Sequence, residues 1–171
     1  MDLLVTVLRL VHIGSGVYWA GTIFFFVTFL QPTVQDLGPD GGKVMVKLFE
    51  RGYLTILPVV ATITVISGFW LLWIVSAGFD PTWMGSRLGI ALSTGGLLAT
   101  AALVAGILVM RPAAQRIWAI ARELPSISDD QVRSDRMAQL ARLRSRTSTS
   151  GRIIFGFLAG AVGLMAIARY V

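Results

Sequence analysis

The sequence predicts an all-α integral membrane protein, built as a four-helix bundle with a cytoplasmic helical hairpin between its third and fourth membrane spans. The composition is the first observation behind this class. Hydrophobic residues make up 55% of the 171 residues and charged residues only 14%, whereas a soluble domain carries about 25% charged residues. A surface so poor in charge is expected to face lipid, so residues 1–171 are interpreted as a single transmembrane domain.

Four apolar segments are the second observation. They are expected to cross the membrane at about residues 3–30, 53–77, 88–110 and 153–171, and each approaches or exceeds the roughly 20 residues that span a bilayer core. Lipid offers no partner to backbone N–H and C=O groups, so each segment must be helical. The first segment is too long for a removable signal peptide and is followed by three more spans.

The connection between the first two spans, residues 31–52, is predicted to begin as a turn-rich loop. Pro32 and Gly38 are among its turn-forming residues. A short amphipathic helix from Lys43 to Arg51 is expected to lead into the second span.

The polar segment 111–150 is the longest connection. Its first part is expected to continue the helix of span three and to end at Pro125. Ser128 and Gln131 form a capping-box pattern, which predicts a second helix reaching about Arg146. Together the two helices would form the hairpin.

Lysine and arginine are distributed unevenly among the connections, which is the third observation. The connection between spans two and three holds only Arg87 at its end, and the other two connections are basic. Basic connections usually stay in the cytoplasm. We therefore expect a bacterial cytoplasmic (inner) membrane protein with both termini outside. Contact with anionic lipid head groups accounts for the net charge of +6, so nucleic acid is not expected as a partner.

Span one carries the residues with the clearest chemical potential. Arg9 and His12 share a helix face within an apolar segment, with Gly16 one turn and Trp19 about two turns further along. A glycine beside an imidazole leaves an opening that suits a flat cofactor. His12 could then ligate a b-type haem and Arg9 could pair with a propionate. The second axial position would fall to Met165, to water or to the same residue across a dimer.

Simpler interpretations and a different metal stay open for the same residues. The glycines of span one could allow close helix packing, His12 could hydrogen-bond a neighbouring helix, and Arg9 could extend to the head groups. Copper, held by His12 and methionines, ranks below haem; the methionines considered are Met1, Met84 and Met165. The absence of cysteine excludes disulfides, thiolate metal sites and thiol catalysis.

Short motifs in all four spans carry a family resemblance. Span one reads LVHIGSGVYWAGTIFFFVTFLQP, in which His12 is followed by Trp19, Ala20 and Gly21, with Pro32 after the helix. Span two ends in ISGFWLL, span three opens with Arg87 and Leu88, and span four ends in LMAIARYV. The chain resembles a superfamily of small bacterial membrane proteins that includes the CopD membrane domain, HemJ-type protoporphyrinogen oxidases and uncharacterised families. It is most similar to the uncharacterised members.

The resemblance implies a four-helix bundle and two kinds of chemistry. With HemJ as the guide, His12 is a haem ligand, although HemJ proteins also use a lysine of span three where this chain has Arg87. With CopD as the guide, the protein handles copper near the outer face. Three hypotheses follow: a haem protein with redox or haem-related chemistry, a non-enzymatic accessory subunit of a larger complex, and a copper-handling or small-solute permease. Whether the protein is an enzyme stays open.

Glycine-rich helix faces also suggest protein partners within the membrane. Gly156 and Gly160 of span four form a small-xxx-small pattern, and Gly163 lies close by. Such patterns let helices approach closely in lipid. A homo-oligomer or a larger membrane complex is therefore expected alongside the lipid bilayer itself.

Overall fold

The computed structural model describes residues 3–170, with Pro39 described by its backbone alone. These residues are helical along most of their length, and no strand occurs among them. Four helical segments are long and apolar enough to cross a membrane: Leu3–Asp36, Tyr53–Val75, Arg87–Ser126 and Asp130–Tyr170. The predicted all-α, multi-pass membrane class is confirmed. Met1, considered for copper, and Val171, the end of the fourth predicted span, lie outside the described residues.

The first helical segment is longer than predicted. It consists of α1 (Leu3–Phe25), a π-helical turn η1 (Phe26–Leu30) and α2 (Gln31–Asp36), so the prediction of a loop beginning at Gln31 was wrong. Pro32 has no N–H, and in a regular α-helix its ring would meet the carbonyl four residues earlier. The wide turn avoids this conflict, since the N–H of Gln31 bonds to the carbonyl of Phe26, five residues back.

The third helical segment contains the same device. It runs through α6 (Arg87–Ala105), a π-helical turn η2 (Gly106–Met110) and α7 (Arg111–Glu123), and ends in the short 3₁₀ turn η3 (Leu124–Ser126). The N–H of Arg111 bonds to the carbonyl of Gly106, and Pro112 follows. The predicted continuation of span three into the polar segment, with its end near Pro125, is confirmed.

Two glycines mark the ends of the short helix between the first two spans. Gly38 and Gly52 have φ angles of +55° and +86°, which favour glycine over residues with a side chain. Between them, α3 (Pro39–Glu50) begins four residues before the predicted Lys43, and α4 (Tyr53–Val75) follows as the second span. The short helix α5 (Pro81–Met84) lies between α4 and α6.

The last helix, α8 (Asp130–Ile167), is continuous where the sequence predicted two helices. Ser128 is not its cap, which corrects the predicted capping box. Asp129 accepts hydrogen bonds from the N–H groups of Gln131 and Val132 at 2.8 and 3.1 Å, and a carboxylate at this position also favours the helix dipole. The helix continues through Gly151, which is buried. A Cβ atom at this position would lie 3.2 Å from Met110 Cε and 3.6 Å from Gln31 Oε1, so the glycine leaves room for these two side chains.

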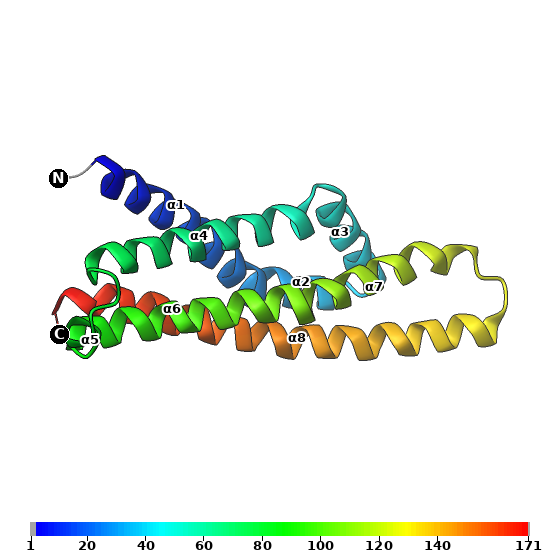
Figure 1. The fold of residues 1–171 in the computed structure, drawn as a ribbon. Coiled ribbons are helices and arrows are strands. Elements are labelled where there is room, and N and C mark those ends of the chain that lie inside the picture. The colour runs from blue at the N-terminus through cyan, green and yellow to red at the C-terminus, as the bar shows by residue number, and fades with distance from the viewer. Residues whose placement is uncertain (1–2, 171) are drawn as a thin grey trace.

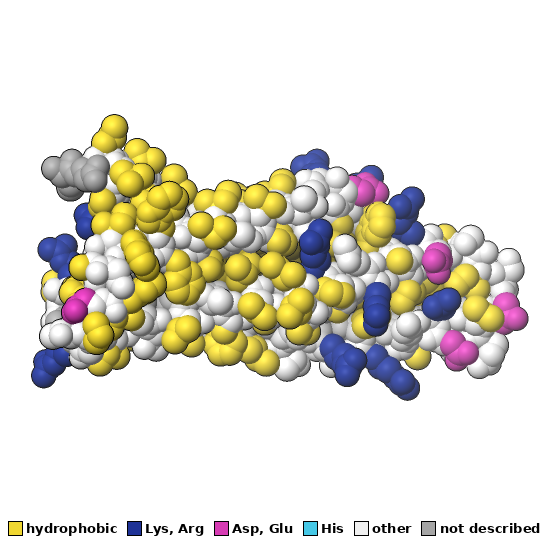
Figure 2. Space-filling model, viewed as in Figure 1, with side chains coloured by type: hydrophobic (Ala, Val, Ile, Leu, Met, Phe, Trp, Pro, Cys, Tyr) yellow, Lys and Arg dark blue, Asp and Glu magenta, His cyan; other side chains and the backbone are white. Residues whose placement is uncertain are grey.

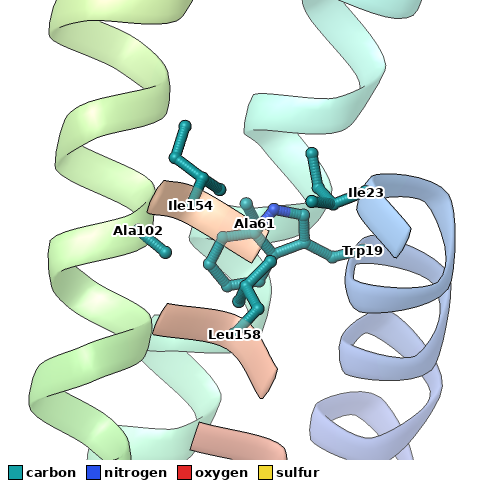
Figure 3. Close-up of a cluster of buried hydrophobic side chains, with 6 residues drawn as sticks. All are labelled: Trp19, Ile23, Ala61, Ala102, Ile154 and Leu158. Atoms are coloured by element: carbon teal, nitrogen blue, oxygen red, sulfur yellow. The ribbon is translucent and has the colours of Figure 1, made fainter. Parts of the chain in front are cut away.

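The long helices pack in two main pairs, α1 with α4 and α6 with α8 (Figure 1). Both described ends of the chain lie at one end of the molecule, and the turn between α7 and α8 lies at the other (Figure 1). All four spans meet in a core cluster of buried side chains (Figure 3): Trp19 and Ile23 from α1, Ala61 from α4, Ala102 from α6, and Ile154 and Leu158 from α8.

Figure 2 shows an apolar band around the middle of the molecule, a few basic side chains at its left end and more on its right half, called here the basic end and formed by α3, α7 and residues 130–152 of α8. Large apolar side chains of the spans are widely exposed, including Val17 at 68%, Ile66 at 59% and Leu97 at 66%. Water would not favour such a surface, whereas a bilayer would. Most lysines and arginines lie where α3, α7 and the first part of α8 come together (Figure 2).

Candidate functional site

His12 faces α4, where its imidazole is fixed by a backbone hydrogen bond. Its Nδ1 lies 2.9 Å from the carbonyl oxygen of Thr64, and Ser67 Oγ lies 3.5 Å away. A carbonyl only accepts, so Nδ1 carries the proton and donates it. In the neutral imidazole the lone pair is then on Nε2.

Gly68 allows this contact between α1 and α4. A Cβ atom at Gly68 would lie only 2.7 Å from His12 Cε1 and 3.0 Å from Nδ1, so any side chain there would displace the imidazole. Ser67 and Gly68 both belong to the ISGFWLL sequence that contributed to the family resemblance. No sequence pattern indicates that this motif packs against His12, because the pairing depends on how α1 and α4 are aligned.

The rest of this α1–α4 contact is a short polar strip with satisfied hydrogen bonds. Thr64 Oγ1 lies 2.9 Å from Ser15 Oγ and 2.9 Å from the carbonyl of Val60, and Ser15 Oγ donates to the carbonyl of Val11 at 2.6 Å. The methyl group of Thr64 lies 3.4 Å from where a Cβ of Gly16 would be. Helix α4 therefore occupies the space beside Gly16 that the sequence analysis treated as an opening.

The other residues predicted to join His12 lie in different surroundings. Arg9 is exposed. Trp19 is 4% exposed and belongs to the core cluster (Figure 3). The side chain of Met165 packs against Gly95 of α6, with Cγ 3.3 Å from where a glycine Cβ would be. Among residues 3–170, no three His, Asp or Glu side chains come together as a metal-binding group.

A cavity of about 170 Å³ lies on the other side of the core cluster, toward the basic end. Trp19, Ile23, Ala61, Ala102 and Ile154 belong to both the core cluster and the cavity wall. Helix α3 contributes Met45 and Phe49, so side chains from α1, α3, α4, α6, α7 and α8 all line the space, which is partly open to the outside. Intramembrane ligand sites commonly have this form, an apolar chamber between helices.

Three polar atoms of the cavity wall are buried without a hydrogen-bond partner among the described residues. They are Gln31 Oε1, Arg111 Nε and Trp118 Nε1. Each such group typically costs about 1–3 kcal/mol when buried. Buried polar atoms are nearly always satisfied in folded proteins, so three unpartnered atoms on residues that line one cavity mark these residues as candidates for contact with a ligand.

The two π-helical turns position two of these three residues. Gln31 directly follows η1 and Arg111 directly follows η2, and each is followed by a proline. Turns of this kind occur frequently at functional sites. The sequence signal was a polar residue and a proline directly after an apolar run, QP in one span and RP in the other. Proline after a glutamine is also typical of a loop start, which is why the sequence alone does not predict this site.

Two further arginines, Arg122 on α7 and Arg144 on α8, lie close to residues of the cavity wall. The guanidinium of Arg122 lies over the Trp118 ring, 4.8 Å from its centroid, a distance at which a cation attracts the ring face. A terminal guanidinium nitrogen of Arg144 lies 3.5 Å from where a Cβ of Gly42 would be. Arg144, which also lines the cavity, thus extends from α8 to α3.

Searches of family models, of curated proteins and of solved structures found no match to this chain.

Proposed function

We propose that this integral membrane protein binds an amphipathic small molecule in the cavity between its spans and its basic end. The observation that carries the proposal is that three residues lining one mainly apolar cavity, Gln31, Arg111 and Trp118, each hold an unpartnered polar atom. The chamber would accept the apolar part of the ligand. Its polar part would supply the missing hydrogen bonds and remove their energetic cost.

The volume limits what enters the chamber. A cavity of roughly 150 Å³ is known to hold a benzene ring, and this one is about 170 Å³. The part of the ligand held in the cavity is then about the size of one aromatic ring or a short acyl segment. A longer tail would extend through the open side of the cavity.

Tryptophan fluorescence tests this proposal. Trp19 and Trp118 line the cavity, so replacing Trp70, Trp73 and Trp83 with Phe makes the remaining emission report on it. We expect the neutral probe 2-(4-bromophenyl)ethanol to quench this emission saturably in detergent, since its heavy bromine acts on contact.

Two alanine variants on α7 provide the matched control. Ala114 lines the cavity and is buried, whereas the adjacent Ala113 is not part of the cavity wall. We expect Ala114→Leu to fill the space and abolish saturable quenching, and Ala113→Leu to leave it unchanged. Equal quenching of both variants would mean that the probe only partitions into the micelle, and the proposal would fail.

The membrane topology forms part of the proposal. We infer a four-helix bundle in a bacterial cytoplasmic membrane, with both termini outside and with the hairpin of α7 and α8 in the cytoplasm, because basic connections are retained there. The chain has no cysteine, so Asp80→Cys and Ser128→Cys each introduce a single thiol. An impermeant maleimide applied to intact cells should label the first variant and not the second; the reverse pattern would invert the topology.

Haem binding through His12 is the second candidate function, and one observation favours it. Donation from Nδ1 to the carbonyl of Thr64 is the arrangement that orients an imidazole with Nε2 available for a metal. The other residues expected to complete the site do not fit around it, because Thr64 fills the space at Gly16 and Met165 packs on α6. A haem at Nε2 would need its second ligand from elsewhere, such as another copy of the chain.

An absorption spectrum of the purified protein tests this second candidate. A Soret band that is present in the native protein and lost in His12→Ala would support it, and a colourless protein from haem-replete cells would exclude it. Copper analysis of the same sample tests the copper-handling alternative. The accessory-subunit alternative predicts instead that the protein copurifies with a stoichiometric membrane partner.

A further inference from the structure

The polar side of the cavity is cationic. Arg111 and Arg144 line it, and no aspartate or glutamate does so among the residues that form its described wall. A cation at the edge of a low-dielectric cavity is stabilised by a counter-charge, because desolvation without one is costly. The missing counter-charge is the feature from which we identify the chemistry of the ligand, an inference that rests on the proposed function of the cavity.

Arg111 is positioned to receive an anion. It directly follows the π-helical turn η2, and its Nε is buried and unpartnered. Trp118, two turns further along α7, also lines the cavity and carries a second unpartnered donor, Nε1. An oxyanion accepts several hydrogen bonds at once, and bonds from a guanidinium to such an acceptor are about twice as strong as neutral ones.

Arg144 adds a second positive charge from another helix. It is exposed on α8 and extends to α3 at Gly42, where a glycine leaves room for its guanidinium. Arg111 on α7 and Arg144 on α8 line the same cavity, so both positive charges act on an oxyanion bound there. The surrounding apolar wall strengthens this attraction, because the local dielectric constant is lower than that of water.

We propose that the ligand of the cavity is an amphipathic organic oxyanion, whose carboxylate or phosphate binds Arg111 and Arg144 and whose apolar body lies against Trp19, Leu57 and Ile154. Two sources share this chemistry. One is the headgroup of an anionic membrane lipid, and the other is a free acid with an apolar body. In either case the Gln31 amide can donate to the oxyanion or accept from a hydroxyl of the ligand.

A matched pair of probes separates charge from shape. The acid 4-bromophenylacetate and the alcohol 2-(4-bromophenyl)ethanol have the same bromophenyl ring and differ in the polar end. In the Trp19/Trp118 reporter, we expect the acid to bind at least about tenfold more tightly than the alcohol, as one charge-assisted hydrogen bond provides. Ala114→Leu should abolish binding of both probes.

Arginine variants assign the preference to the cavity. Arg111→Gln should remove most of the acid's advantage and leave binding of the alcohol within about twofold. Arg116→Gln is the control, because Arg116 is exposed on the same helix and does not line the cavity. If Arg111→Gln fails to fold, the exposed Arg144→Gln provides the same test with a smaller expected loss.

The two ligand sources are separated in nanodiscs. Phosphatidylglycerol should displace the acid probe, relative to phosphatidylcholine, if the source is a lipid headgroup; no displacement points to a free acid.

Equal binding of acid and alcohol, or equal losses in Arg111→Gln and Arg116→Gln, would overturn the oxyanion proposal while the cavity-binding function survives. If neither probe shows quenching that depends on Ala114, the proposed function itself fails.

Discussion

Two regions between the helices of this protein treat polar side chains in opposite ways. At the α1–α4 contact, His12, Ser15 and Thr64 all make hydrogen bonds, and Gly68 lets the helices approach closely. In the cavity, the side chains of Gln31 and Arg111 each bury an atom without a partner. The first arrangement stabilises the fold, whereas the second costs stability unless a ligand or water completes it.

The backbone differs between the two regions in a corresponding way. Around His12 the helix α1 is regular, and its side chains meet α4 at ordinary helical spacing. At the cavity the first and third helical segments both widen into π turns before a proline. The wide turns change the direction in which the following side chains project. A local irregularity in two helices thus coincides with the place where polar groups remain unsatisfied.

The largest stability effect is expected at Gly68. Gly68→Val would place a branched side chain where even a Cβ atom lies 2.7 Å from His12 Cε1, so the imidazole must move and lose its bond to Thr64. We expect a destabilisation of about 3 kcal/mol, from overpacking together with the lost hydrogen bond. Thermal unfolding in detergent, followed by circular dichroism, measures it.

Gly21 supplies the control for this substitution. It lies within α1, and a Cβ atom there would meet nothing within 4 Å. Gly21→Val changes helix propensity in the same direction without a steric conflict, so its effect should be much smaller. Equal losses in the two variants would show that the Gly68 contact with His12 contributes nothing specific.

The next effect is expected in the cavity and has the opposite sign. Gln31→Met keeps the length of the side chain and removes the unpartnered Oε1, so without ligand it should stabilise the protein by about 1–2 kcal/mol. Gln115→Met, on the exposed face of α7, should change stability little. A loss of stability in Gln31→Met would mean that the amide already has a partner, and the contrast between the two regions would disappear.

The sequence was sufficient for the class of protein and the approximate spans, because apolar length determines both. The starts of α4 and α6 agree with the predicted spans to within one residue. The predictions that failed, the loop at Gln31 and the break before Ile153, both assumed that proline, glycine or polar residues end a helix. The structure accommodates Pro32 with a wider turn and buries Gly151 in a contact.

The candidate sites were harder to predict, since they depend on residues far apart in sequence. His12 stood out as the sole histidine, but Thr64 and Gly68 could be paired with it only once α1 and α4 were aligned. Arg111 was interpreted as part of a basic cytoplasmic connection. Its Nε is buried because α3 and α8 pack beside this part of the third segment, and no periodicity in the sequence indicates that arrangement.

A smaller effect is expected at Thr64. Thr64→Val removes the hydroxyl that lies between Ser15 on α1 and the carbonyl of Val60, and hydrogen bonds between membrane helices contribute about 0.6–2 kcal/mol. Thr62→Val is the matched control, because the hydroxyl of Thr62 bonds only to the carbonyl of Pro58 in its own helix. We expect a loss of about 1 kcal/mol for the first variant and less than half of that for the second, measured by the same unfolding experiment. Equal effects would place the stabilisation within α4 rather than between helices.

The smallest effect is expected on the outer face of α3, which covers the cavity. The ion pair of Lys43 and Asp40 has an N–O distance of 2.7 Å, with side chains 81% and 73% exposed. The hydrogen bond and charge of Lys43 hold the pKa of Asp40 below its ordinary value of 3.8. A carboxyl whose pKa is lowered on folding stabilises the folded state above its ordinary pKa, and this stabilisation is lost as the pH falls through the folded-state pKa. Water screens so exposed a pair, however, so the contribution is small.

Asp40→Asn should therefore leave both the unfolding temperature at pH 7 and the binding of the bromophenyl probes unchanged within error. Lowering the pH to 3 should have no larger effect on the native protein than on this variant. This expectation follows if α3 is held over the cavity by apolar contacts of Met45 and Phe49 rather than by charge. A loss comparable to that of Thr64→Val would show instead that surface charge fixes α3, and closure of the cavity would then depend on ionic strength.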